Sequence, residues 1–439
     1  MSDRFRWVYC QLDTLRRCMP SSIRKSLNEL PITLDDTYER ILQGIPKEKF
    51  QHARRLFQCI VAAIRPLRVK ELAEIFAIEF SPNEVTNLVE GWRPDNPEEA
   101  VLSACSSLIA IIDDEGSKIV QFSHFSVKEY MTSDRLQTSD IGHVCDYYIP
   151  LEPAHTVLAR ACMAVFLQLD EKVDKERVAT FPLAEYSSKH WVNHAKFENV
   201  QSQIQDDLKH LFNPRKPHLH ACIWMRDSPY YRNSPEQPSP FDKTHLYYAV
   251  FYGFSEVAKW LITTHAEDVN AKCHEDRTPL QGASQNGHVD AVRVLLDHGA
   301  DVNSQDDTNW MPLHYASEGG HLKVVQLLLD HGAHVNSQND VNWMPLHFAS
   351  SKGHLKVVQL LLEHEATLNA RSIFDSSPIY LASEWGHLDV VRLLLSHGAD
   401  VHIQGRFETV SGQTPFQRAT AKGHHDIAQL LLEHGAKRE

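Results

Sequence analysis

The stretch Met311-Pro-Leu-His-Tyr-Ala-Ser-Glu-Gly-Gly-His-Leu-Lys-Val-Val-Gln-Leu-Leu-Leu-Asp-His-Gly-Ala333 joins two short helical patterns through a glycine turn. Its opening recurs along the second half of the chain at steps of 33, 33, 33 and 37 residues, each time as a residue followed by proline, at Thr278, Met311, Met344, Ser377 and Thr414. A degenerate first copy begins at Thr244, 34 residues before the second. Six copies at one period indicate a repeat architecture.

Each copy carries the local signals of a helix-turn-helix unit. Proline in the first helical turn has no N–H to leave unpaired, and the Thr or Ser before it can cap the helix. Glycine after each helix allows the left-handed turn that ends it. The run from Val324 to Leu329 places its apolar residues on one wide helix face, which a single copy cannot bury alone. Neighbouring copies are therefore predicted to stack into an α-solenoid.

These copies resemble ankyrin repeats, whose T-P-L-H-x-A core, Gly-His turn and leucine-rich second helix they share. In that family a turn with positive φ lies two residues before the Thr-Pro position, and this chain has there Asp242, Asp276, Asn309, Asn342, Asp375 and Gly412. Asn, Asp and Gly tolerate such a turn. The last copy has a four-residue insertion around Arg406–Ser411, and such insertions usually lie on a binding edge. The resemblance implies six repeats over 243–439 that bind a protein partner of unknown identity through their concave face and loop tips.

The candidate partner-binding residues lie at the loop tips and at the start of each first helix, which is expected to be exposed. They are Arg277, Trp310, Tyr315, Glu318, Trp343, Phe348, Phe374, Glu384 and Trp385. Tryptophan is enriched among interface hot spots, so an exposed Trp at two equivalent turns favours binding. The alternative is that Trp310 and Trp343 simply stack on each other across repeats. Both interpretations can hold together.

The first half has the order of a winged-helix domain, predicted over residues 46–135. Helical periodicity covers 50–64, 69–78 and 98–108, and a strand at 109–112, a turn at 113–116 and a strand at 118–122 follow. Residues 146–225 are predicted to be a helical connector, and the Pro/Ser-rich segment 226–242 a linker. The fold class expected for the whole chain is mainly α, with a winged helix and a helical connector before the solenoid.

This half resembles the segment that follows the NTPase core in fungal NACHT–ankyrin proteins, which are relatives of NOD-like receptors. The resemblance rests on Phe5-Arg-Trp-Val8, Leu30-Pro31, Arg65-Pro-Leu67, Glu71-Leu-Ala73 and Phe122-Ser-His-Phe-Ser-Val-Lys-Glu-Tyr130. It implies a helical remnant of the NACHT module at 1–45, a winged helix of the type described from GPI inositol-deacylases, and a sensing role for the ankyrin repeats, as in innate immunity or heterokaryon incompatibility.

The nucleotide-binding part of that family has no counterpart here. Residues 1–240 contain four glycines, none nearer than 25 residues to another, so they hold no phosphate-binding G-x-x-x-x-G-K-[ST] loop. Gly282 and Gly287 have the right spacing, but His288 and Val289 replace the Lys and Ser/Thr. We therefore expect no nucleotide, and a chain that is a fragment, a shortened gene product or a partner that kept the regulatory and sensing parts of such a receptor.

Other kinds of site have weaker support. His218, His220 and Cys222 are zinc-ligand types, but their spacing spreads them around a helix and matches no zinc pattern. The predicted third helix and wing of the winged helix carry Glu98, Glu99 and Asp113-Asp-Glu115, and acidic residues there argue against nucleic-acid binding. We expect no catalytic residue, cofactor or metal, and for the winged helix self-association or autoinhibitory packing.

Charge and cysteine usage are consistent with these expectations. Lys+Arg of 44 against Asp+Glu of 57 give −13, and residues 241–439, with 15 basic and 24 acidic residues, account for −9 of it. Neither half has the positive field that binding to a phosphate backbone needs. The eight cysteines form no C-x-x-C pair, and no apolar stretch is long enough to span a membrane. The expected compartment is the cytoplasm, with the nucleus possible.

Overall fold

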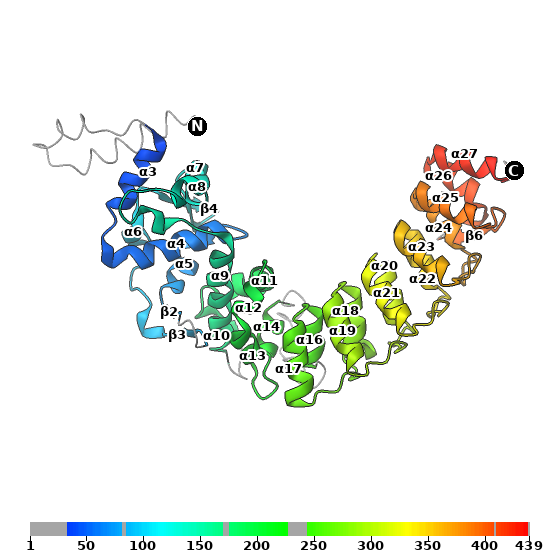
Figure 1. Ribbon diagram of the computed structural model, residues 1–439, viewed down its shortest axis with the longest axis horizontal. Helices are drawn as coiled ribbons and strands as arrows, with labels where there is room; N and C mark the ends of the chain where they lie inside the picture. The colour runs from blue at the N-terminus through cyan, green and yellow to red at the C-terminus, as the bar shows by residue number, and fades with distance from the viewer. Residues whose placement is uncertain (1–32, 81–84, 170–174, 227–243, 408–409, 438–439) are drawn as a thin grey trace, which may run out of the picture. The chain divides into compact units, whose positions relative to one another are not determined.

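The computed structural model describes residues 33–80, 85–169, 175–226, 244–407 and 410–437. The chain divides into two compact units, Met1–Gln237 and Pro238–Glu439 (Figure 1). Helices predominate in both units and strands are few, which confirms the mainly α fold class. Most of the predicted NACHT-type remnant, residues 1–32, and nearly all of the predicted linker, residues 227–242, lie outside the described residues.

The winged helix is built from three helices and a small antiparallel sheet. Its elements in chain order are α4 (Phe50–Ala62), β1 (Leu67–Arg68), α5 (Val69–Ile75), α6 (Pro97–Cys105), β4 (Ile109–Asp114) and β5 (Ser117–Phe122). The strand order is β1-β5-β4, with Ile111 opposite Val120. Leu56, Leu72 and Val101, one from each helix, are fully buried in its core. The expected order of three helices followed by a hairpin is confirmed.

The wing is tighter than the sequence indicated. The strands continue to Asp114 and resume at Ser117, so the turn consists of Glu115 and Gly116, with φ of 50° and 85°. Two successive residues with positive φ make the two-residue hairpin that matches the twist of the strands. The side chain of Asp113 accepts a hydrogen bond from the Gly116 N–H at 2.9 Å, which explains how acidic residues stabilise this turn.

Shorter elements surround the winged helix. Helix α3 (Leu34–Gln43) begins with a capping box between Thr33 and Asp36, and its Tyr38 hydroxyl lies 2.8 Å from the Ser126 hydroxyl at the start of α7. The remaining elements are η1 (Lys47–Lys49), β2 (Ile78–Glu79), β3 (Asn87–Leu88), η2 (Glu90–Trp92), α7 (Phe125–Met131), α8 (Asp134–Gln137) and η3 (Val144–Tyr147). The contact between α3 and α7 attaches α3 to the winged helix.

Helix α9 is the centre of the helical connector. The elements after the winged helix are α9 (Leu151–Phe166), α10 (Lys175–Ala179), α11 (Ala184–Ala195), α12 (Val200–Gln203), α13 (Gln205–Leu211) and α14 (His218–Arg226). Helix α9 packs against α4, α11, α12, α13 and α14, and its residues 161–166 are all fully buried. Ala159, Ala161 and Ala164 allow these helices to approach closely.

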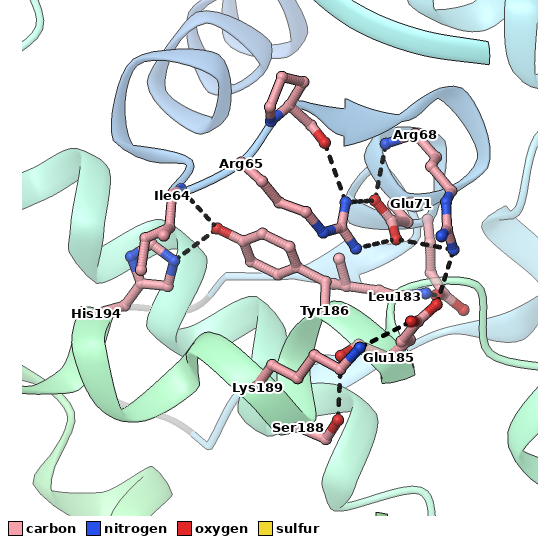
Figure 2. Close-up of polar contacts among 12 residues, drawn as sticks. Ile64, Arg65, Arg68, Glu71, Leu183, Glu185, Tyr186, Ser188, Lys189 and His194 are labelled. Carbon is pink, nitrogen blue, oxygen red and sulfur yellow. Dashed lines mark hydrogen bonds and ion pairs between the residues drawn. The ribbon is translucent and has the colours of Figure 1, made fainter. Parts of the chain in front are cut away.

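A polar network joins the winged helix to the connector (Figure 2). The buried carboxylate of Glu71 accepts two hydrogen bonds from the Arg65 guanidinium, at 2.7 and 2.8 Å, and one from the Arg68 N–H at 2.7 Å. The Arg68 side chain in turn donates to Glu185 of α11 at 2.8 Å. A buried carboxylate is stable only when its oxygens are well bonded, so Glu71 fixes the chain between α4 and α5.

A chain of aromatic hydroxyl and imidazole groups continues this junction. The Ile64 N–H donates to the Tyr186 hydroxyl at 3.2 Å, and that oxygen lies 2.8 Å from Nε2 of His194 (Figure 2). Nδ1 of His194 lies 2.8 Å from Nδ1 of His155 on α9. Burial, with the neighbouring His155 adding to it, lowers the pKa of His194 to about 3, so this imidazole is a neutral bridge between α9 and α11.

The described part of the second unit contains six helix pairs, each with a first and a second helix, and the pairs stack along the chain (Figure 1). The pairs are α16 (His245–Phe251) with α17 (Ser255–His265), α18 (Pro279–Gln285) with α19 (Val289–Asp297), α20 (Pro312–Glu318) with α21 (Leu322–Asp330), α22 (Pro345–Ser351) with α23 (Leu355–Glu363), α24 (Pro378–Trp385) with α25 (Leu388–Ser396), and α26 (Pro415–Lys422) with α27 (His425–Glu433). First helices pack against each other more closely than second helices do. The stack therefore curves with its first helices on the concave side.

The predicted left-handed turns are present wherever the structure describes them. The residues two positions before the Thr-Pro equivalents have φ of 55° at Asp276, 59° at Asn309, 56° at Asn342, 54° at Asp375 and 75° at Gly412. Asp242, the sixth position, lies outside the described residues. The local preference of Asn, Asp and Gly for this conformation thus sets the register of the repeats.

Histidines link consecutive repeats. In each Gly-His turn the imidazole Nε2 lies 2.9–3.1 Å from a backbone carbonyl at the end of the preceding first helix, in the pairs His288–Phe251, His321–Gln285, His354–Glu318, His387–Ser351 and His424–Glu384. Each ring also lies against the left-handed glycine of the preceding repeat, where a Cβ atom would collide with it. These histidines therefore recur because each one joins two consecutive repeats of the stack.

The insertion in the last repeat forms a hairpin. Strands β6 (Gly405–Phe407) and β7 (Val410–Gln413) pair antiparallel with a shift in register. Gly405 lies against the ring of Tyr380, where a Cβ atom would come within 2.9 Å of ring carbons. The predicted longer loop is thus a short two-stranded extension of the stack.

Candidate functional site

The candidate binding face is organised by the turns that precede the first helices. Arg277, Trp310 and Trp343 each directly follow a residue with positive φ, so the same sharp turn presents the same position in three consecutive repeats. In the third repeat the Asp306 side chain accepts a hydrogen bond from the Trp310 N–H at 2.9 Å. In the fourth repeat the Asn339 side chain accepts from the Trp343 N–H at 2.8 Å. Such local acceptors stabilise the turn itself.

Phe348 lies between the two tryptophans. Its ring centroid is 4.4 Å from that of Trp310 and 4.9 Å from that of Trp343. Trp310 also lies 4.9 Å from Tyr315. The two tryptophans are half-buried, whereas Phe348 and Tyr315 are buried. Tyr315, Trp310, Phe348 and Trp343 are called the aromatic row below. The stacking considered from the sequence exists, but it runs through Phe348.

A guanidinium group extends the aromatic row at its first end. The Arg277 guanidinium carbon lies 5.4 Å from the centre of the Tyr315 ring, within cation–π range, and its Nη2 is 3.0 Å from Glu275. The Tyr315 hydroxyl donates to the buried carboxylate of Asp306 at 2.5 Å. Burial together with that carboxylate raises the pKa of Tyr315 far above its usual range, so the hydroxyl is a permanent donor.

The structure separates the nine predicted residues into three classes of exposure. Phe374 and Trp385 are exposed, at 43% and 53%. Arg277, Trp310, Trp343 and Glu318 are half-buried, and Glu318 lies 3.6 Å from the Lys352 ammonium. Tyr315, Phe348 and Glu384 are buried, so the expectation that they lie exposed on the first helices is wrong. Instead, the buried rings of Tyr315 and Phe348 pack against the half-buried tryptophans.

Glu384 has a partner in the next repeat. Its Oε1 accepts from Nε of Arg418 at 3.1 Å and also from Nη2, while its Oε2 is buried without a hydrogen-bond partner. Both side chains are buried, so this pair holds α24 to α26. Glu384 cannot contact a partner protein in this conformation because its side chain is 1% exposed.

Two features of the face were not found from the sequence. Tyr247 of the first repeat, which is buried, lies over Gly282, where a Cβ atom would come 2.9 Å from its ring. Ile373, 53% exposed, lies beside Phe374 on the fifth turn. The sequence did contain a signal for the Tyr247 contact. Gly282 is the one glycine at the repeat position that holds Tyr315 and Phe348, and a glycine there leaves room for a neighbouring ring.

Other chemistry finds little support in the described residues. Within those ranges no three His, Cys, Asp or Glu side chains come together as metal ligands would. Four of the six described cysteines are buried. On the winged helix, Glu99 and the residues Asp113 and Asp114 at the end of β4 are exposed, and Lys118 forms an ion pair with Glu98 at 2.6 Å. No helix in the described part of the chain is long and apolar enough to cross a membrane.

Comparison with known protein families agrees with the geometry of the stack. The family described as ankyrin repeats (three copies) matches residues 216–306, 246–339, 313–405 and 372–438, which together cover just over half of the 439 residues. The chain belongs to the ankyrin-repeat family. Its ankyrin-repeat unit is of a kind that mediates protein–protein interaction. The first match begins within the predicted connector, at its last helix α14.

A second family accounts for the first unit. The winged-helix domain of GPI inositol-deacylase matches residues 38–141, which begin within α3 and include all three strands of the sheet. Neither matched family is a nucleotide-binding module, and the relationship to NACHT receptors stays a prediction.

One curated relative is similar over most of this chain. The azaphilone pigments biosynthesis cluster protein L of Monascus ruber is 32% identical over 299 residues, which are 62% of this chain. The matched region spans 60% of the length of that relative.

Proposed function

We propose that this ankyrin-repeat protein acts by capturing a protein partner on the aromatic row and the neighbouring exposed side chains, and not by catalysis. The observation that carries the proposal is the pair of half-buried indoles of Trp310 and Trp343, held in fixed positions by the buried Phe348. Rigid aromatic side chains with one open face are favoured at binding hot spots because little entropy is lost when a partner covers them.

The exposed residues of the fifth repeat extend this face. Ile373, Phe374 and Trp385 are 53%, 43% and 53% exposed, which is unusual for three large apolar side chains on one turn and the helix that follows it. Together with the aromatic row they give a partner apolar anchors from the third repeat to the fifth. The buried supports and the exposed anchors are the arrangement expected of a surface kept for binding.

The test is direct capture with the intact protein as bait. Partners from a lysate of the source organism would be cross-linked, identified by mass spectrometry, purified and titrated against the wild-type chain. Trp310→Ala with Trp343→Ala should weaken the best partner at least tenfold, because each indole contributes on the order of 1–2 kcal/mol at an interface.

Trp260→Ala is the matched control. Trp260 is also half-buried, but it lies on the second helix α17 and contacts His265, away from the aromatic row. Its loss should leave affinity unchanged. If the Trp310/Trp343 variant keeps full affinity while its melting temperature falls strongly, the tryptophans are structural and the proposed face is wrong.

A second candidate rests on domain order. A winged helix of the GPI inositol-deacylase type before ankyrin repeats is the order that suggests the regulatory and sensing part of a nucleotide-switched receptor. Immunoblotting a native lysate with an antibody to residues 243–439 tests it. A band well above the 50.1 kDa of this chain would support the receptor, and a band near that mass would support the separate binding module.

A further inference from the structure

We propose that the segment captured by this face is an extended stretch rich in arginine and lysine. The proposal rests on the proposed function and adds the chemistry of the partner to it.

The turns of the third and fourth repeats contain acidic residues and no lysine or arginine, and the turn of the fifth contains Asp375 together with Arg371. Asp307, Asp340 and Asp375 are exposed at their tips. No lysine or arginine occurs between Arg293 and Lys323 or between Lys323 and Lys352, the two stretches that contain the whole aromatic row. The next basic residues along the chain are Lys352, which faces Glu318, then Lys356 and Arg371. A partner that approaches the row therefore meets negative charge first.

Arg277 is an example within this chain of a guanidinium group that contacts both an aromatic ring and a carboxylate on this face. It occupies the turn position that holds Trp310 and Trp343 in the next two repeats, and it stacks on Tyr315 while pairing with Glu275. The same two ingredients, an aromatic face and a carboxylate at the turn tip, are present at Trp310 with Asp307 and at Trp343 with Asp340. An arginine from a partner can repeat the arrangement there, since guanidinium groups bind aromatic faces and carboxylates together.

The other end of the face has a second internal example. Arg418 occupies the first-helix position that holds Tyr315 and Phe348 in earlier repeats, and its guanidinium is bound by Glu384. The chain thus supplies its own guanidinium in the second and sixth repeats, whereas the turns of the third and fourth repeats have aromatic and acidic groups without one. An acidic partner segment would be repelled by these carboxylates, and so would a nucleic acid.

The experiment measures binding of fluorescein-labelled peptides to the intact protein by anisotropy near physiological ionic strength. The probes alternate glycine with arginine, lysine, glutamine or glutamate. The arginine peptide should bind best and the lysine peptide more weakly, because only the planar guanidinium stacks well on indole. Equal binding of the glutamine or glutamate peptide would overturn the proposal.

Two charge-matched triple variants locate the interaction. Asp307→Asn, Asp340→Asn and Asp375→Asn together should weaken the arginine peptide about tenfold. Asp297→Asn, Asp330→Asn and Glu363→Gln remove the same charge from one repeated position at the ends of the second helices, and should change affinity less than about twofold. If both triple variants lose affinity for the arginine peptide equally, the peptide is attracted unspecifically to an acidic protein and the proposal is wrong.

The outcome is separable from that of the proposed function. If a captured partner is cross-linked to Trp310 or Trp343 through a neutral or acidic segment, the binding function stands and the basic segment is wrong. If the arginine peptide binds and depends on the turn carboxylates, the basic segment is supported even before a cellular partner is known.

Discussion

The ring of Phe348, on the first helix of the fourth repeat, lies 4.4 Å from the ring of Trp310 on the turn of the third. A side chain that is 5% exposed thereby determines the position of one that can meet a partner. Stability and the proposed binding should therefore be coupled at this contact, because the residue that packs between two repeats also supports the indole surface.

Phe348→Ala should lower the free energy of unfolding by about 3 kcal/mol, the usual result of removing a buried aromatic ring. Amide hydrogen exchange in α20 and α22 should rise together, since the ring is shared by both repeats. Phe348→Tyr is the matched control because Tyr315 occupies the same position one repeat earlier, and it should leave exchange nearly unchanged. Faster exchange in α22 alone would contradict a shared contact.

The buried histidines His314 and His347 should make the ankyrin-repeat unit sensitive to acid. Nδ1 of each accepts a backbone N–H, from Met311 at 2.9 Å and from Met344 at 3.0 Å, and a protonated ring cannot accept that bond. Burial lowers the pKa of each to about 4, from an unfolded value near 6.5. Because the folded pKa lies below the unfolded one, the stabilisation is complete above pH 6.5 and is lost as pH falls toward 4, by up to about 3 kcal/mol per histidine.

The chain contains its own titration-free controls for these histidines. Gln281 and Gln417 occupy the same repeat position, and their Oε1 atoms accept the equivalent N–H groups of Thr278 and Thr414 at 2.7 and 2.9 Å. His314→Gln with His347→Gln should therefore keep most of the stability at pH 7 and lose less of it at pH 4.5. Chemical denaturation at the two pH values measures this difference. An unchanged pH dependence would show that other groups control it.

Glu365 should be a weak point in the fourth repeat. It has φ of 63°, at the position where the other repeats from the second to the sixth have Gly299, Gly332, Gly398 and Gly435. A side chain costs about 1 kcal/mol in this left-handed conformation, so Glu365→Gly should raise stability by about 0.5–1 kcal/mol. Thermal unfolding compares it with Gly332→Ala, which should lower stability. A neutral or destabilising Glu365→Gly would contradict the backbone argument.

Local signals in the sequence were enough for the positions of the turns and helices. The residues Asp276, Asn309, Asn342 and Asp375 act within their own turns, so their conformation follows from their identity. The burial of Tyr315 and Phe348 depends on which side chains the next repeat brings against them, and periodicity within one repeat does not contain that information. The wing turn was placed too wide because strand pairing, a non-local interaction, extends both strands up to Glu115 and Gly116.

The ion pair between Glu384 and Arg418 could not be predicted from the sequence either, because the two residues lie in different repeats on either side of the insertion. Removing one residue of this pair should destabilise the protein strongly. Arg418→Leu leaves the buried Glu384 carboxylate without its cation, apart from Lys422 at 3.9 Å, and should lower the free energy of unfolding by about 3–5 kcal/mol.

The double variant Glu384→Ser with Arg418→Leu should recover most of that loss, because Ser351 and Leu381 are the residues at the corresponding positions one repeat earlier. Hydrogen exchange of α24 and α26 in the single and double variants measures the coupling between the two residues. If the double variant is as unstable as Arg418→Leu alone, the buried carboxylate is not the source of the instability, and the packing of the Arg418 side chain against α24 would have to account for it.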